Sequence, residues 1–551
     1  MKNSAAGDAI AKLIISRYIR LPKRGKPQPG GSQWTILAGF VVEDPPRPLS
    51  VVALATGTKC VGGSSASSAR DDAVVCDSHA EVLARRALVR WLLDQASLAT
   101  CASESDDSVF IRPPSGSGRL QLRSTVKLHM YVSQAPCGDA TITRAGGSTG
   151  AHPVEWERYG RHDGKTPSIL RTKPGKGAVS HSLSCSDKIA IWNVVGVQGA
   201  LLAHLIEPVF LASIAVGDDF CRDALQRALW QRARPLAAPL PVRFRRRGAG
   251  AAGEEDPAEP MLACLACRDA SFAASRESLV TAAAAAAPAA AATPSQPQPC
   301  GHSVNWFRTA TTTSTSSATA SMLPQNCDLA HLAVYVEAEA TLAKTGLRIG
   351  TTKRDAKLVP APPLRVRSRL CRRNILVEFD AVYRRVRAWR AAAQTTTTTT
   401  TTTSLDTLLL ELSALVAASQ SKAKAVAHAA EEEQERWSRV HRALKGAATD
   451  YQNAKEALRA GCFAAWQRRR AAELVVECSP PLATEKKTSA EKTLAEKTAS
   501  AASGSAAIIG TGDRDLALHA AADVDAGASA AVEPPQKKQR AASSPHSTTI
   551  G

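Results

Sequence analysis

The sequence D-S-H-A-E-V-L-A-R-R, residues 77–86, places an imidazole and a carboxylate two positions apart. Two other short strings follow it in order: P-C-G-D at residues 136–139 and S-C-S-D-K at residues 184–188. Each string lies where the apolar spacing predicts the start of a helix. The three strings therefore bring one histidine, one glutamate and two cysteines to helix starts, where side chains from distant parts of a chain can meet.

The pattern around these strings alternates strands and helices. Ser78 is expected to cap a helix that runs to about residue 94, with Glu81 three positions later as in a capping box. Further helices are expected from near Cys137 and from Ser186. Strands are expected at residues 34–43, 49–56, 126–133 and 207–216. This order predicts an α/β fold in which helices pack on the faces of a sheet.

One imidazole and two thiolates form the ligand set of a catalytic zinc ion with one open coordination position. We predict that His79, Cys137 and Cys185 bind zinc, which lowers the pKa of a bound water to about 7. Glu81 is not a ligand in this prediction, because its place two residues after His79 suits it to move protons to and from that water. The chemistry expected is attack of the activated water on an aromatic ring carbon that bears an amino group.

The spacing of the two cysteines departs from a common zinc-deaminase signature, H-x-E…P-C-x-x-C. The residue three positions after Cys137 is Ala140, and the next candidate ligand is Cys185, which belongs to a different predicted helix. A second cysteine group, Cys264-x-x-Cys267 with Cys300-x-His302, lies in an alanine-rich stretch, and we expect it to be a chance arrangement.

The chain has 551 residues, and much of it is not core material. We expect one domain over residues 1–475 and a disordered tail over 476–551, because the tail lacks the large apolar residues that offset chain ordering. Low-complexity insertions are expected within the domain near residues 97–124, 243–301, 309–325 and 394–404.

Charge and cysteine content limit the partners and the compartment. The net charge is +19, which favours polyanion partners such as nucleic acid or inositol phosphates. No apolar leader and no apolar run of about 20 residues is evident, so we expect an intracellular chain, in the nucleus, the cytoplasm or both, with no membrane span. The 13 cysteines are then expected to stay reduced. The sequence indicates no obligate protein partner.

Several longer strings resemble the editing deaminase domain that double-stranded-RNA adenosine deaminases share with eukaryotic tRNA-specific adenosine deaminases. The strings are T-G-T-K-C (56–60), D-S-H-A-E-V-L-A-R-R (77–86), P-C-G-D-A (136–140), R-T-K-P-G-K-G (171–177), S-C-S-D-K-I-A-I-W-N (184–193), S-V-N-W (303–306), S-R-L-C-R (368–372) and Y-Q-N-A-K (451–455). The resemblance implies a cytidine-deaminase-like core, a mixed β-sheet with helices on both faces, and a mostly helical C-terminal extension that encloses an inositol phosphate.

The opening strings, Y-I-R-L-P-K-R-G-K-P at 18–27 and W-T-I-L-A at 34–38, resemble the tRNA branch of that family. This branch implies hydrolytic conversion of adenosine to inosine in tRNA, at the nucleotide 3′-adjacent to the anticodon (position 37 of tRNA-Ala). It also implies that Thr58 and Lys59 contact the RNA. Two alternatives stay open: a deaminase of other structured RNA or messenger RNA, and a non-catalytic RNA-binding member of the family.

The resemblance also implies a structural inositol hexakisphosphate. Asp77 and Lys188 would relay between this ligand and the metal site. Two positions depart from the family pattern: Cys76 stands where asparagine is frequent, and Ile191 where arginine is, so the ligand is expected to lose a polar contact at each. The residues implied to bind the phosphates are Arg85, Arg86, Lys188, Arg372, Lys445, Tyr451, Lys455 and Trp466.

Overall fold

The computed structural model describes residues 2–61, 72–100, 108–113, 118–142, 182–233, 240–244, 262–286, 296–309, 338–356, 364–393, 404–420 and 427–460. The chain divides into two units, Met1–Cys478 and Ser479–Gly551, and only the first contains described residues. The expected tail over 476–551 and the expected ligand residue Trp466 therefore lie outside the described residues.

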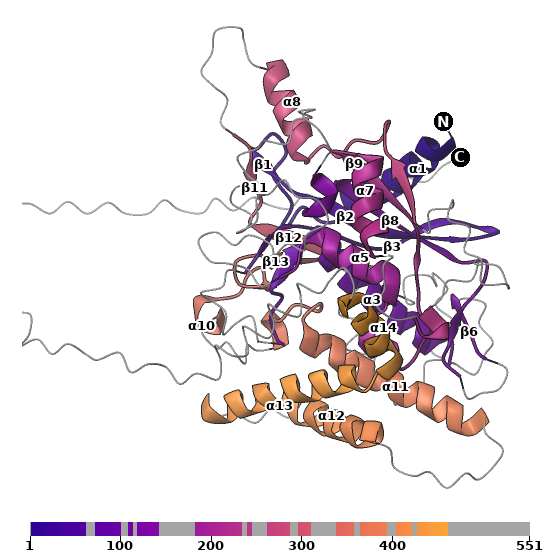
Figure 1. The fold of residues 1–551 in the computed structure, drawn as a ribbon. Helices are drawn as coiled ribbons and strands as arrows, with labels where there is room; N and C mark the ends of the chain where they lie inside the picture. Colours follow the sequence, from indigo (N-terminus) through magenta and orange to yellow (C-terminus); the bar gives the residue numbers. More distant parts are fainter. Residues whose placement is uncertain are drawn as a thin grey trace, which may run out of the picture. The chain divides into compact units, whose positions relative to one another are not determined.

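The centre of the first unit is an eight-stranded mixed sheet (Figure 1). Strands β10, β9 and β8 pair in parallel, and the other neighbouring pairs are antiparallel, so the expected α/β class is confirmed. In spatial order the strands are β10 (Ala263–Ala266), β9 (Leu211–Asp218), β8 (Lys127–Gln134), β2 (Leu37–Asp44), β3 (Arg47–Thr56), β12 (His302–Phe307), β13 (Glu339–Leu342) and β14 (Leu347–Arg348).

Helices cover both faces of this sheet. Helix α3 (Ala80–Leu98) packs across one face, and helix α1 (Lys2–Arg20) packs across the other. Residues 37–42 of strand β2 are all apolar because both faces are covered: Phe40 belongs to the core on the α3 side, while its neighbour Val41 belongs to the core on the α1 side. Side chains alternate between the faces of a strand, so a strand covered on both faces needs apolar residues at nearly every position.

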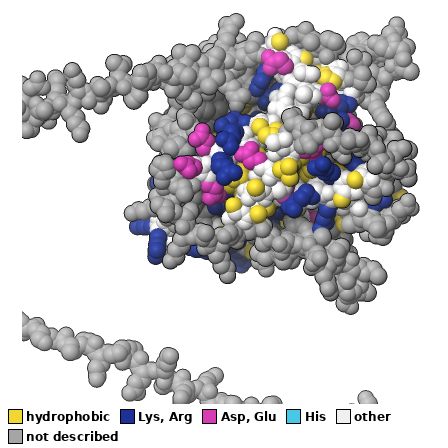
Figure 2. All heavy atoms as spheres, turned by 90° about the horizontal axis from the view of Figure 1, so that it is seen from below, with side chains coloured by type: hydrophobic (Ala, Val, Ile, Leu, Met, Phe, Trp, Pro, Cys, Tyr) yellow, Lys and Arg dark blue, Asp and Glu magenta, His cyan; other side chains and the backbone are white. Residues whose placement is uncertain are grey.

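A helical layer from the C-terminal part of the first unit packs on α3. Helix α11 (Arg372–Ala393) contacts α3 directly, α12 (Ser404–Gln420) contacts α11, and α13 (Ala427–Gly446) contacts α12 (Figure 1). Helix α14 (Thr449–Ala460) packs against α5 (Cys185–Val195). Seen from below in Figure 1, the molecule shows apolar side chains interspersed with both signs of charge (Figure 2).

The remaining elements are short. They are the strands β1 (Gln33–Trp34), β4 (Thr58–Cys60), β5 (Asp77–His79), β6 (Phe110–Ile111), β7 (Gln121–Leu122) and β11 (Gln298–Pro299), the helices α6 (Gly199–Leu202), α7 (Arg222–Leu229), α8 (Arg276–Ala286) and α10 (Lys353–Ala356), and the 3₁₀ turns η2 (Asp139–Thr141), η3 (Gln231–Ala233), η4 (Val242–Phe244) and η6 (Leu364–Val366). None of the helices in the described ranges is long and apolar enough to cross a membrane.

The stretch 243–301, expected as a low-complexity insertion, contributes to the main sheet. Its residues Ala263–Ala266 form the edge strand β10, which pairs in parallel with β9. The pairing partner is about 50 residues earlier in the chain, so local composition carries no sign of it. The helix expected from Ser186 is α5, which ends at Val195 because the chain leaves the helical conformation at Gly196, whose φ is 81°.

Candidate metal centre and active site

The D-S-H-A-E string passes directly from a strand into a helix. Strand β5 pairs with β4, with His79 opposite Thr58 and Ser78 opposite Lys59. Helix α3 begins at Ala80, so the N-cap is His79, and the prediction that Ser78 caps this helix is wrong. The reason is tertiary, because pairing with β4 holds Ser78 in an extended conformation. Glu81 lies in the first turn of α3 and is 1% exposed.

Cys137 lies in a turn that the third string holds in place. The expected helix near Cys137 is only the 3₁₀ turn η2 within the residues described as far as 142. Ser186 replaces the missing helical hydrogen bonds, because its hydroxyl accepts the Ala140 N–H at 3.1 Å and lies 2.9 Å from the Pro136 carbonyl oxygen. The Ser186 N–H also donates to the Cys137 carbonyl oxygen, at 3.0 Å.

Cys185 is the first residue of α5, where the sequence placed it. The N-cap is Ser184, whose hydroxyl accepts the Asp187 N–H at 3.2 Å. The Cys185 N–H points to the sulfur of Cys137 at 3.4 Å. A helix N-terminus favours negative charge, so this contact suits a thiolate at Cys137.

The three predicted ligands meet. The Nδ1 atom of His79 is 3.9 Å from the Cys137 sulfur and 3.8 Å from the Cys185 sulfur, and all three atoms lie within 4.8 Å of one another. Tetrahedral zinc with its usual bond lengths separates a nitrogen and a sulfur ligand by about 3.6 Å. The donor set and its spacing therefore fit zinc, with Glu81 two residues further along the chain.

A second group, Cys60 with Asp77 and His79, is also close enough to hold a metal ion. The carboxylate of Asp77 is already engaged, however. Its Oδ1 accepts the His79 N–H at 3.0 Å, and its Oδ2 accepts from Ser182 at 2.7 Å and from the Lys188 Nζ at 2.5 Å. The two-cysteine group is therefore the better candidate for a metal ion. Asp77 links the cation of Lys188 to the backbone of His79.

Four cations expected to bind inositol phosphate lie near one another. Burial lowers the pKa of Arg85 to about 10, with Tyr451 raising it and Arg86 lowering it. Burial also lowers the pKa of Arg86, and Arg372 lowers it further. Like charges that lie close together are costly unless anions neutralise them. Lys445 belongs to the same group through His441, and Lys455 lies one turn after Tyr451 in α14.

Sequence reasoning missed two residues of this region, Asp72 and His441. The Asp72 side chain is 2% exposed and accepts from Arg372 at 3.2 Å and from Ser438 at 2.9 Å, and His441 Nδ1 lies 3.8 Å from it. Asp72 thereby connects the chain that leads into β5 with helices α11 and α13. No motif marks either residue, since their partners are about 300 residues away or more.

We expect Gly138→Ala to disrupt the metal centre. Gly138 has φ 108°, and a Cβ atom there would lie 2.3 Å from the Ser184 hydroxyl, so both the backbone and the contact with α5 become strained. Strain of this kind costs about 1–3 kcal/mol. Thermal unfolding and zinc content of the purified variant measure the effect. Gly301→Ala is the matched control, because its Cβ would meet no atom within 4 Å; equal losses in both variants would contradict the prediction.

Among the described residues, the groups close enough to hold a metal ion do not include Cys264 and Cys267. Cys264 belongs to the core on the α3 side of the sheet, and Cys267 packs against the core on the α1 side. Burial raises the pKa of the Cys264 thiol to about 11, so it stays protonated. A separation of three residues along an extended chain points the two sulfurs to opposite faces, which prevents joint coordination.

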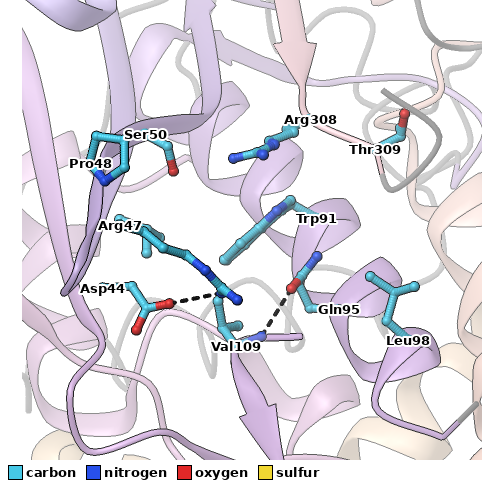
Figure 3. A pocket seen from close by; sticks show the side chains of 11 residues that line it. Asp44, Arg47, Pro48, Ser50, Trp91, Gln95, Leu98, Val109, Arg308 and Thr309 are labelled. Carbon is cyan, nitrogen blue, oxygen red and sulfur yellow. Dashed lines mark hydrogen bonds and ion pairs between the residues drawn. The ribbon is translucent and has the colours of Figure 1, made fainter. Parts of the chain in front are cut away.

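The far end of α3 borders a separate cavity of about 140 Å³ (Figure 3). Trp91 and Gln95 of α3 face it, together with Arg308 and the ion pair between Arg47 and Asp44 at 3.2 Å. Twelve residues of helix, about 18 Å, separate Trp91 from the position of His79. This cavity is therefore distinct from the metal centre.

A protein-family model described as the adenosine-deaminase (editase) domain matches residues 53–470, well over half of the chain. The chain belongs to this family.

Among curated proteins, the chain is similar to the double-stranded RNA-specific editase Adar of Drosophila melanogaster, at 34% identity over 42% of this chain and 36% of that protein. It is also similar to tRNA-specific adenosine deaminase 1 of Drosophila melanogaster, at 36% identity over 40% of this chain and 58% of that protein. The human tRNA-specific adenosine deaminase 1 is 30% identical over 43% of this chain and 71% of that protein. The match spans less than two thirds of both fly relatives.

Proposed function

We propose that this chain is a zinc-dependent hydrolase that converts adenosine to inosine in RNA. The observation that carries the proposal is that the side chains of His79, Cys137 and Cys185 lie close together. The buried Glu81 lies beside them in sequence, in the first turn of the helix that His79 precedes. Membership of the adenosine-deaminase (editase) domain family supports it.

A zinc ion in this site would supply a nucleophile at neutral pH, because it lowers the pKa of water from 15.7 to about 7. Glu81 would accept a proton from the attacking water and deliver protons to the purine ring and to the departing nitrogen. One C6–O bond forms and the C6–N6 bond breaks, so adenosine and water give inosine and ammonia. Asp77 would keep the His79 backbone in place while Lys188 balances its charge.

We propose tRNA as the substrate, and the nucleotide 3′-adjacent to the anticodon (position 37 of tRNA-Ala) as the target. Two of the relatives are named tRNA-specific adenosine deaminases. A loop nucleotide is already unpaired, so it needs less energy to enter an active site than a base in a duplex. Thr58 and Lys59, on the strand that pairs with β5, would contact the RNA beside the target.

The test is incubation of the purified chain, made in a eukaryotic host, with total tRNA and with a long RNA duplex, followed by sequencing for A-to-G changes. A single change beside one anticodon, absent with Glu81→Ala, would support the proposal in full. Changes only in the duplex would favour an editor of other structured RNA, an activity that the similarity to the editase Adar makes the second candidate. RNA binding by the zinc-loaded chain without any change would favour a non-catalytic member.

We further propose that inositol hexakisphosphate binds among the cations of Arg85, Arg86, Arg372 and Lys445. The support is that these cations gather where burial lowers the pKa of Arg85 and Arg86, an arrangement that a multiply charged phosphate ring would stabilise. Lys188, Tyr451 and Lys455 would complete the site in the described residues. Phosphate analysis of the protein after denaturation measures whether the ligand is present.

We expect binding of inositol hexakisphosphate to tighten as the pH falls from 7.5 to 5.5, beyond the effect of phosphate titration. Burial and the cations of Lys445, Arg372 and Arg86 lower the pKa of His441 to about 3, while Asp72 raises it. The folded chain without ligand therefore loses stability as the pH falls below 6.5, where an unfolded histidine gains a proton. A polyanion would raise the pKa of His441 in the folded chain and so reverse this loss of stability.

The measurement is calorimetric binding to ligand-depleted protein at both pH values. His441→Asn should remove the part of the pH dependence that belongs to the histidine. An equal pH dependence in the wild type and in His441→Asn would contradict the assignment.

A further inference from the structure

Exposed and half-buried cations from separate segments of the chain gather around strand β14. Two come from the loop that follows α1, two from the β13–β14 region and two from α10. We call this group the β14 basic surface; its members are Lys23, Arg24, Lys344, Arg348, Lys353 and Arg354.

Close contacts in the described residues bring these segments together. The guanidinium of Arg24 donates to the Ile349 carbonyl oxygen at 2.9 Å, so the loop after α1 rests on the end of β14. A Cβ atom at Gly25 would lie 2.6 Å from the side chain of Ala340, which leaves space there only for a glycine. Lys344 lies in the turn between β13 and β14, and α10 begins shortly after β14, at Lys353.

Among the described residues, few acidic side chains balance this surface. Arg348 has Glu339 at 3.6 Å, and the neighbouring Asp355 pairs with Arg365 at 2.6 Å. Within the described ranges, Lys23, Lys344, Lys353 and Arg354 make no side-chain hydrogen bond or ion pair. Exposed cations without acidic partners hold counterions that a polyanion can displace, and the release of those counterions drives binding.

The same surface adjoins the segment that leads into β5, the strand that carries His79. The Val75 N–H donates to the Gly346 carbonyl oxygen at 3.1 Å, in the turn that carries Lys344. Gly346 has φ 68°, and a Cβ atom there would lie 2.3 Å from the Val75 carbonyl oxygen, so the two backbones are in close contact. Val75 precedes Asp77 by two residues and His79 by four.

We propose that the β14 basic surface binds the phosphate backbone of the tRNA stem next to the target nucleotide. This inference rests on the proposed function. Cations that approach from several directions suit phosphate contacts, which orient an RNA without reading its sequence. The surface would therefore position the substrate while the metal centre and Glu81 act on the target base.

The test compares two triple variants that each remove three positive charges. Lys23→Gln/Lys353→Gln/Arg354→Gln removes half of the surface, and Lys12→Gln/Arg268→Gln/Arg442→Gln removes exposed cations elsewhere. Binding to full-length tRNA is measured at several salt concentrations in a Glu81→Gln background. We expect the slope of log K against log salt to fall in magnitude by about 2–3 in the first variant, at about 0.7–0.9 per lost phosphate contact. The control should match the unaltered protein.

Activity in the background with Glu81 intact separates the inference from the proposed function. The first variant should show a raised KM for tRNA with kcat nearly unchanged, because it loses binding that the ground state and the transition state share. If the first variant has the same salt slope and the same KM as the wild type, the inference is overturned, even if all three proteins form inosine. Failure of every protein to form inosine, with the slope still reduced, would overturn the function and keep the binding surface. Binding to phosphatidylserine vesicles but not to tRNA would overturn the inference in favour of a membrane surface.

Discussion

Replacing Glu81 by alanine is expected to abolish inosine formation while zinc stays near one ion per chain. Glu81 is buried in the first turn of α3, two residues from His79. It does not belong to the candidate metal-binding group of His79, Cys137 and Cys185. Loss of a general acid–base group lowers rates by about 10²–10⁴-fold. Inosine formation under single-turnover conditions and zinc content by atomic absorption measure the two effects.

Glu81→Gln is the companion variant, because it keeps the size of the side chain and removes its charge. Both variants should lose activity, and both should unfold close to the wild-type temperature. Loss of zinc in either variant would mean that Glu81 is a metal ligand. Retained activity with retained zinc would remove it from the chemistry.

Replacing Cys185 by serine is expected to remove both zinc and activity. The Cys185 sulfur lies 3.8 Å from His79 Nδ1, and its side chain is fully buried at the start of α5. A serine hydroxyl is a poor ligand for zinc, which binds protein thiolates at about 2.3 Å. Structural and catalytic zinc also contributes folding energy, so the unfolding temperature should fall with the metal.

Cys264→Ser is the matched control for this experiment, because Cys264 is 2% exposed and has no place in the metal centre. It should keep its zinc and its activity even if it loses some stability. Chelation of the wild-type protein should reproduce the Cys185→Ser result, and added zinc should restore the wild type alone. Equal zinc loss in the two serine variants would show that general destabilisation releases the metal.

The residues of the candidate metal centre could be named from the sequence because the necessary signal is local. A histidine and a glutamate two residues apart, and a cysteine next to a good N-cap, can be recognised within a few positions. The order of strands and helices around them follows from apolar spacing in the same way. His79, Cys137 and Cys185 were predicted together, and the structure brings them within 4.8 Å.

The details that failed depend on distant parts of the chain. Ser78 has the chemistry of an N-cap, but pairing with β4 keeps it in a strand. The turn after Cys137 is shaped by the hydroxyl of Ser186, about 50 residues later. Composition marked 243–301 as an insertion, although pairing with β9 makes four of its residues an edge strand.

By itself, the sequence determined the class of the fold and the types of residue available for metal binding and proton transfer, since both are set by side-chain chemistry and short-range periodicity. Only the tertiary structure decided which of these residues meet. It placed Asp72 between two helices of the C-terminal layer, separated Cys264 from Cys267 across a sheet and gathered the six cations around β14. Contacts between residues hundreds of positions apart arise from strand pairing and helix packing, which have no counterpart in any short stretch of sequence.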